Sequence, residues 1–121
     1  MSGSTPSTAE VIERFNQVFQ QRDPSGLAAL VGADCVMEGL SPAPGGTRVE
    51  GAEECIRFWS DFATDPANDF EVEDVVCAQE LSVIRWKLVF GPGEKEYVRC
   101  VNVMRVRDGL IIEALGYAKT G

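Results

Sequence analysis

The stretch that decides the fold runs from residue 97 to residue 118 and reads YVRCVNVMRVR, then DG, then LIIEALGYA. Both flanking runs are rich in residues that favour strands, and an Asp-Gly pair between two such runs is a strong hairpin signal. Asp108 and Gly109 therefore predict a tight turn between two antiparallel strands.

Successive side chains point to opposite faces of a strand, so each predicted strand has two rows. In the first strand one row is apolar except for a central amide: Val98, Cys100, Asn102, Met104 and Val106. In the second strand one row is mostly small: Ile112, Ala114, Gly116 and Ala118. A polar group in an apolar row beside missing side-chain volume predicts a pocket, with Asn102 facing into it.

The other two rows of this hairpin predict a second surface. They contain Tyr97, Val101, Val103, Ile111, Glu113, Leu115 and Tyr117. This face is apolar enough to prefer a partner sheet to water. We expect a homodimer through this outer face, bordered by Arg85, Lys87, Arg99 and Arg105.

Helical spacing of apolar residues predicts three helices in the first half of the chain. The first covers residues 7–22 and begins with the capping box Ser7-x-x-Glu10. The second begins at Asp23-Pro24 and ends at Gly32. The third covers residues 52–63 and has an apolar face: Ala52, Cys55, Ile56, Trp59, Phe62 and Ala63.

Three more strands are predicted over residues 34–38, 70–79 and 82–90. The segment 39–51 holds prolines and glycines and predicts a loop long enough to form the rim of a pocket, and residues 91–93 predict a turn. In the strand over 70–79, strict alternation separates two rows: Val72, Asp74 and Val76 against Glu71, Glu73, Val75 and Cys77. The whole order predicts an α+β fold, a cone-shaped curved antiparallel sheet packed on three N-terminal helices and open at one end.

The length of 121 residues is enough for one domain with its own core. We expect residues 1–6 to be a flexible leader and residues 7–121 to be a single domain. No apolar run approaches the roughly 20 residues that span a bilayer. Because the start also lacks the regions of a secretion signal, we expect a cytoplasmic protein that does not enter a membrane.

Charge and residue content disfavour several functions. The net charge of −8 would repel phosphates, so we expect no nucleic-acid partner. The chain has no histidine, which excludes Ser-His-Asp and Cys-His machinery and any metal site that needs histidine. Its four cysteines are far apart and form no Cys-x-x-Cys motif, so we expect reduced thiols, no metal and no cofactor.

Several local phrases, together with the order of elements, resemble the SnoaL-like, ketosteroid-isomerase-like superfamily, also called the nuclear transport factor 2-like fold. The phrases lie at residues 14–15, 22–23, 27–30, 51–59, 83–86 and 105–113. The resemblance covers nearly the whole chain. It implies the cone-shaped fold, a pocket inside the cone and a homodimer, while enzymes and plain binders share such a fold.

The resemblance also implies where catalytic groups would lie. The steroid isomerases of the family use a tyrosine, an aspartate base and a second, protonated aspartate; those positions match Phe15, Gly39 and Asn102, with Glu38 one residue before Gly39. The epoxide hydrolases of the family need carboxylates near Lys87 and Gly116, and neither is present. The cyclases need a histidine, which the chain lacks.

Two residues are candidates for catalysis. Glu38 at the mouth of an apolar cone would suit a general acid or base, or else it is a solvated strand end. Asn102 would polarise a carbonyl or stabilise an oxyanion, or else it pairs within the core. The candidates for ligand binding are Phe15, Phe19, Trp59, Phe62, Trp86, Leu88, Cys100, Met104, Ala114 and Gly116.

Three functions fit this sequence. The first is a small enzyme of isomerase, cyclase or lyase type that acts by proton transfer on an apolar carbonyl-containing molecule, with Glu38 as base and Asn102 as oxyanion donor. The second is a non-catalytic binding domain for a small hydrophobic ligand in the same pocket. The third is a dimeric scaffold whose cone is filled by side chains.

Overall fold

The structure is a computed structural model that describes residues 5–40, 42, 44–90 and 96–119. Residues 1–4 of the predicted leader and the predicted turn at 91–93 lie outside the described residues. The elements are α1 (Thr8–Gln20), the 3₁₀ helix η1 (Pro24–Ala29), β1 (Val31–Glu38), β2 (Arg48–Glu50), α2 (Ala52–Thr64), β3 (Asn68–Ala78), β4 (Leu81–Phe90), β5 (Glu96–Arg107) and β6 (Leu110–Ala118).

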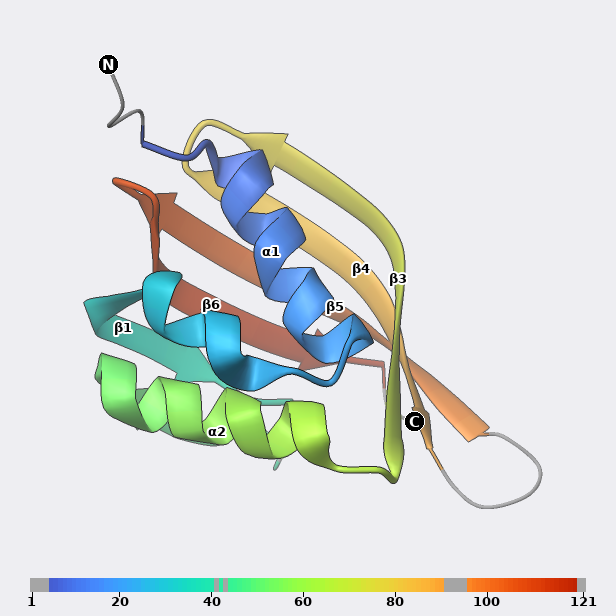
Figure 1. Cartoon of the computed structure of the whole chain (residues 1–121). Coiled ribbons are helices and arrows are strands. Elements are labelled where there is room, and N and C mark those ends of the chain that lie inside the picture. The colour runs from blue at the N-terminus through green and yellow to red at the C-terminus, as the bar shows by residue number, and fades with distance from the viewer. Residues whose placement is uncertain (1–4, 41, 43, 91–95, 120–121) are drawn as a thin grey trace.

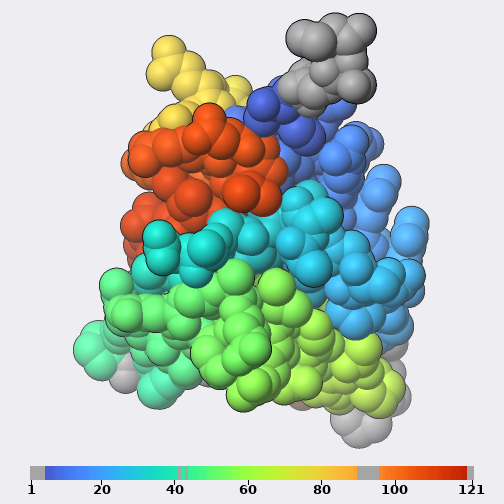
Figure 2. Space-filling model, turned by 60° about the vertical axis from the view of Figure 1, so that its left-hand side comes forward, coloured from blue at the N-terminus to red at the C-terminus, as the bar shows by residue number. Residues whose placement is uncertain are grey.

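The strands form one curved sheet in the order β2-β1-β6-β5-β4-β3, and the helices lie over one face of it (Figure 1). The pairs from β3 to β6 are antiparallel, as predicted, whereas β1 runs parallel to β6. Figure 2 shows η1 between α1 and α2 on this side of the molecule. The predicted α+β fold with three helices and a curved sheet is therefore confirmed.

The first helix begins as the sequence predicts. The backbone N–H of Glu10 donates to Ser7 Oγ at 3.1 Å, and the backbone N–H of Ser7 donates to Glu10 Oε1 at 2.9 Å. These bonds hold the pKa of the Glu10 carboxyl below its ordinary value. The helix ends at Gln20, two residues earlier than predicted, because Arg22 has a left-handed backbone with φ 55°.

The second helix is shorter than predicted, and β1 is longer. Gly32 lies inside β1 and does not end a helix. A Cβ atom on Gly32 would come within 3.2 Å of the Ile111 carbonyl oxygen, so a glycine lets β1 approach β6 closely. The predicted loop over 39–51 also contains a short strand, β2, which pairs antiparallel with β1.

The Asp108-Gly109 hairpin is confirmed, because β5 and β6 pair across it. Asp108 and Gly109 have φ values of 53° and 76°, the positive values that a tight turn between twisted strands requires. Asn102 lies opposite Gly116 in this ladder, and Met104 lies opposite Ala114.

Two irregularities change which side chains face the core. In β3 the register shifts between Val72 and Asp74, so Val75 and Cys77 join the inner row while Asp74 and Val76 face outward. In the β5–β6 ladder a shift places Ile111 opposite Val106 and Glu113 opposite Arg105. The predicted alternation in these two segments is therefore wrong: Ile111, expected on the outer face, is fully buried.

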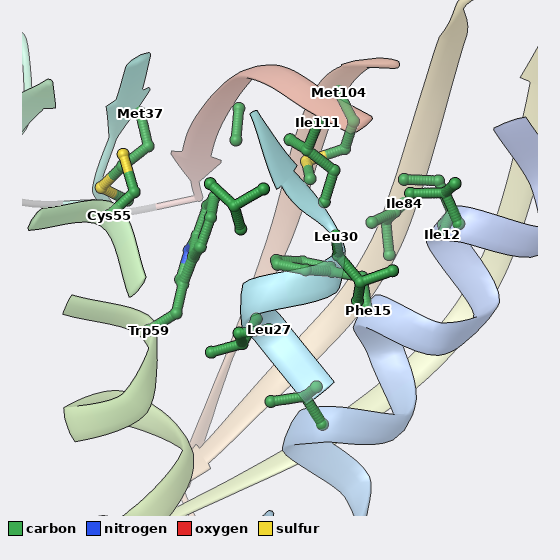
Figure 3. Close-up of a cluster of buried hydrophobic side chains, with 14 of the residues drawn as sticks. Ile12, Phe15, Leu27, Leu30, Met37, Cys55, Trp59, Ile84, Met104 and Ile111 are labelled. Carbon is green, nitrogen blue, oxygen red and sulfur yellow. The ribbon is translucent and has the colours of Figure 1, made fainter. Parts of the chain in front are cut away.

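The core lies between the sheet and the helices. Figure 3 shows side chains of α1, η1 and α2 meeting side chains of the sheet in one cluster. Phe15 of α1 is 1% exposed, and its ring lies 5.0 Å from that of Trp59 of α2. Ile84, Met104 and Ile111 complete the cluster from the sheet side.

The shift in β6 predicts different costs for two neighbouring isoleucines. Ile111→Ala should lower the free energy of unfolding by about 2–5 kcal/mol, because it opens a cavity in the packed core. Ile112→Ala is the matched control and should cost at most about 1 kcal/mol, because Ile112 is only partly buried. Urea unfolding of both variants measures this difference, and a larger loss at Ile112 would contradict the register.

Candidate functional site

A cavity of about 280 Å³ lies between the inner face of the sheet and the two long helices. The helices contribute aromatic rings, and the sheet contributes one amide and one glycine. The lining residues are Phe15, Phe19, Met37, Glu38, Gly39, Leu40, Thr47, Phe58, Trp59, Phe62, Phe70, Trp86, Leu88, Asn102 and Gly116.

Aromatic rings contact one another around this cavity and form a stiff wall. Phe19 of α1 lies 5.8 Å from Phe62 of α2 and 5.3 Å from Phe70 of β3, measured between ring centroids. Phe70 in turn lies 4.8 Å from Trp86 of β4, and Phe62 lies 6.1 Å from it. Because several of these pairs meet edge to face, each ring holds its neighbours in place.

Seven of the ten residues predicted to bind a ligand line the cavity: Phe15, Phe19, Trp59, Phe62, Trp86, Leu88 and Gly116. Cys100, Met104 and Ala114 lie in the packed core instead, with exposed fractions of 3%, 0% and 3%. Met104 fills the space that the small side chain of Ala114 leaves opposite it in the ladder. The cavity therefore begins at Gly116 and not lower in the sheet.

Six lining residues were not among the predicted catalytic or ligand-binding residues: Met37, Gly39, Leu40, Thr47, Phe58 and Phe70. Gly39, Leu40 and Thr47 lie in the segment predicted to be a pocket rim. Phe70 is the third residue of β3, a strand in which the shift after Val72 breaks the alternation of inward-facing and outward-facing side chains. Phe58 precedes Trp59 on α2, and its spacing alone gave no signal that it reaches the cavity.

Asn102 is the amide of the site. Its Oδ1 atom accepts a hydrogen bond from the indole Nε1–H of Trp86 at 3.1 Å. Gly116 lies opposite it, and a Cβ atom there would come within 3.4 Å of Oδ1 and 3.1 Å of Leu40 Cδ2. The absence of a side chain at Gly116 therefore keeps the space beside Asn102 open.

Glu38 contributes to the wall in a different way from the one predicted. Residues opposite each other in a ladder point to the same face, and Met37 pairs with buried Ala114 while Glu38 pairs with Leu115 of the outer row. The Glu38 carboxylate forms an ion pair with Arg48 of β2 at 3.1 Å. Its backbone carbonyl, 3.1 Å from where a Cβ of Gly116 would lie, is the part that faces the cavity.

The residue that occupies the cavity-facing position after Met37 is Gly39. A Cβ atom on Gly39 would come within 3.3 Å of Phe58 Cζ, which belongs to the wall. Among the lining residues that the structure describes, Glu38 is the only one with a carboxylate, and the ladder turns that carboxylate away. The cavity is thus apolar, with one amide as its main side-chain hydrogen-bonding group besides Thr47 at the rim.

The buried cysteines are protonated thiols at neutral pH. Burial raises the pKa of the Cys100 thiol to about 11 and also raises the pKa of Cys35 and Cys55. Cys55 Sγ donates to the Cys35 carbonyl oxygen at 3.5 Å. Since the thiolate is the nucleophile, these three thiols are unsuited to covalent catalysis.

In the part of the chain that the structure describes, no group of three or more Cys, Asp and Glu side chains could hold a metal ion. No helix within the described ranges is long and apolar enough to cross a membrane.

A family model described as a SnoaL-like domain matches residues 12–114. The chain therefore belongs to the SnoaL-like domain family. A solved structure of an NTF2-like protein of unknown function from Mesorhizobium loti is 42% identical and has a TM-score of 0.90, with 99% of this chain and 97% of that chain covered. A search of curated proteins finds no match.

Two further structures are similar in fold. One is a putative SnoaL-like polyketide cyclase from Jannaschia sp. CCS1, with 19% identity, a TM-score of 0.71 and coverage of 98% and 92% of the two chains. The other is a steroid delta-isomerase from Pseudomonas aeruginosa, with 19% identity, a TM-score of 0.76 and coverage of 93% and 80%. At this identity the likeness concerns the fold alone.

The burial of the thiols predicts how the native protein reacts with iodoacetamide. At pH 8 we expect one adduct, on Cys77, which is the only cysteine among the four that is not fully buried. Mass spectrometry of intact protein measures the adducts, and Cys77→Ser should remove the single one. Four adducts should appear after unfolding in urea. Rapid native labelling of Cys100 would contradict its raised pKa.

Proposed function

We propose that this chain is a binding protein for a small apolar molecule, held in the cavity between α1, α2 and the sheet. The observation that carries this proposal is the aromatic wall with Asn102 set into it. Ligand sites are typically apolar and aromatic with a few placed polar groups, and this cavity has that composition.

The size of the cavity limits the ligand. An apolar cavity of roughly 150 Å³ holds benzene in another protein. The cavity here is about 280 Å³, which corresponds to a molecule of two fused rings. It lies just below the roughly 300–1,000 Å³ of sites for drug-sized ligands, so a larger molecule would extend past the rim of the cavity.

The second candidate is an enzyme of isomerase, cyclase or lyase type that uses proton transfer, with Glu38 as base and Asn102 as oxyanion donor. The amide at Asn102 favours it, because one oriented donor can supply about 3 kcal/mol at a developing oxyanion. The orientation of Glu38 disfavours it, because the carboxylate lies on the outer face with Arg48. Binding without catalysis is therefore the better-supported function.

A cavity-filling variant tests binding. We expect 1-indanone, a two-ring ketone, to bind in calorimetric titrations, and Leu88→Trp to weaken that binding at least about tenfold by filling the cavity. Leu81→Trp is the matched control, because Leu81 lies on the same strand but is 40% exposed and outside the lining. Equal affinities in both variants, with both still folded by circular dichroism, would rule out this cavity as the site.

Exchange of the α-protons of 1-indanone for deuterium, followed by NMR, separates binding from catalysis. We expect the protein to leave the exchange rate at its uncatalysed value, because no described carboxylate faces the cavity. The catalytic candidate requires acceleration that falls at least about tenfold in both Glu38→Gln and Asn102→Ala. It also requires an unchanged rate in Glu50→Gln, since Glu50 pairs with Arg48 at 2.8 Å but lies outside the cavity.

We also propose that two copies of the chain associate through the outer face of the sheet. Val101 and Tyr117 lie opposite each other there, and Tyr117 is 54% exposed. Three of the four cations predicted at this face are paired with acids of the same chain: Arg85 with Asp74 at 3.6 Å, Arg99 with Glu73 at 3.3 Å and Arg105 with Glu113 at 3.8 Å. The fourth, Lys87, lies over the Tyr97 ring at 4.8 Å from its centroid. Because acids and cations alternate on this face, a second copy can approach it despite the net charge of −8.

A charge placed at the centre of this face should separate the copies. We expect Val101→Glu to raise the dissociation constant of the dimer at least about tenfold, because a two-fold axis would bring the two carboxylates together. Sedimentation velocity measures the change. Ala9→Glu, on the exposed side of α1, is the control and should remain dimeric. A wild-type protein that sediments as a monomer would overturn this proposal.

A further inference from the structure

Trp86 and Asn102 form the one side-chain hydrogen bond recorded between two cavity-lining residues in the described part of the chain. They lie on neighbouring strands, where Trp86 pairs with Cys100 and Ile84 pairs with Asn102, so they are diagonal neighbours on the inner face. Trp86 is 3% exposed, and its Nε1 atom lies 3.1 Å from Asn102 Oδ1.

The chemistry of the indole determines which end of the amide faces it. An indole N–H is a donor only, so Asn102 must present its oxygen to Trp86. The reversed amide would set two donors against each other and leave a buried N–H unpaired, which is costly. The Nδ2 end of Asn102 is therefore the end that remains for a ligand.

That Nδ2 group is open to the cavity. No hydrogen bond to it is recorded among the described residues, and Asn102 lines the cavity. In the described ranges, the one sealed and unpaired side-chain nitrogen or oxygen atom is Oδ1 of Asn16, on α1. Asn102 Nδ2 is therefore neither paired nor sealed among the described residues, whereas Oδ1 is the amide atom that lies 3.4 Å from where a Cβ of Gly116 would be.

We propose that Trp86 is a positioning residue that fixes Asn102 as a hydrogen-bond donor, so that the ligand is an uncharged molecule presenting an acceptor at this point. A ketone, an ether or a ring nitrogen meets this requirement, and an N–H or O–H group directed at Asn102 does not. The inference rests on the proposed binding function and adds that the ligand presents a hydrogen-bond acceptor, and not a donor, to Asn102. Trp86 acts through Asn102 and not by its own contact with the acceptor.

Calorimetry with three two-ring probes tests whether the site prefers a hydrogen-bond acceptor to a donor. 1-Indanone carries an acceptor, indole carries a donor N–H, and indane carries neither. In Trp86→Phe the amide can turn either way, so the preference for 1-indanone over indole should fall about tenfold. The smaller ring of phenylalanine changes the wall for all three probes, so the affinity for indane is the reference against which the ratio of 1-indanone to indole is read.

Leu81→Phe is the control. Leu81 lies on the same strand as Trp86, but it is 40% exposed and outside the cavity lining. We expect this variant to keep the wild-type preference, whereas Asn102→Leu should lose it as Trp86→Phe does. If wild-type protein binds the probes and Trp86→Phe keeps their ratio of affinities, the role of Trp86 is overturned while the binding function stands.

A ligand-free measurement keeps the inference separate from the binding function. In NMR of the free protein, the Trp86 indole proton should exchange slowly with solvent, and the Asn102 side-chain amide protons should exchange fast. Fast exchange of the indole proton would contradict the claim that Trp86 fixes the orientation of the Asn102 amide, even if the probes bind. Failure of wild-type protein to bind any of the three probes would overturn the binding function and the polarity assigned to its ligand.

Discussion

The register of the β5–β6 ladder is the constraint on which the cavity depends. It sets Met104 opposite Ala114 and, two residues along, Asn102 opposite Gly116. A large side chain fills the space above a small one in the first pair, whereas no side chain fills the space above glycine in the second. The turn at Asp108-Gly109 sets the first pairs, Arg107 with Leu110 and Val106 with Ile111, and the shift between Arg105 and Val106 then moves the pairing by one residue of β6. The turn and the shift together thus decide where the core ends and the cavity begins.

The helices keep that space from collapsing. Core side chains normally close-pack, so an open volume persists only where its lining resists rearrangement. Phe15, Phe19 and Phe62 are anchored on two helices and contact one another or rings of the sheet at centroid distances of 4.9–6.1 Å. Large rings held by their neighbours cannot move inward singly. The hydrogen bond from Trp86 to Asn102 fixes the orientation of the one amide in this wall.

Short sequence patterns correctly predicted the features that depend only on residues close together in the chain. The capping box, the hairpin, the inner row of β5 and the aromatic faces of α1 and α2 follow from neighbouring residues, and the structure has them. The pairing of strands that are distant in the sequence determined the features that these patterns did not predict. Ile111 takes the core position expected of Ile112 because β6 shifts against β5, and Cys77 turns inward because β3 shifts against β4. The direction of Glu38 follows from its pairing with Leu115 of β6, which is 77 residues away in the sequence, so no short pattern reveals it.

Among the described residues, the aromatic wall of the cavity and the lack of a carboxylate at its inward-facing position 39 have a common cause. The resemblance to steroid isomerases places their base at Gly39, the position that faces inward after Met37. A Cβ atom there would already lie 3.3 Å from Phe58 Cζ. Even a Cβ atom requires that ring to shift by a few tenths of an ångström, so Phe58 and a side chain at residue 39 compete for the same space. In this chain the aromatic ring occupies that space, which supports the proposal that the cavity binds an apolar molecule without removing a proton from it.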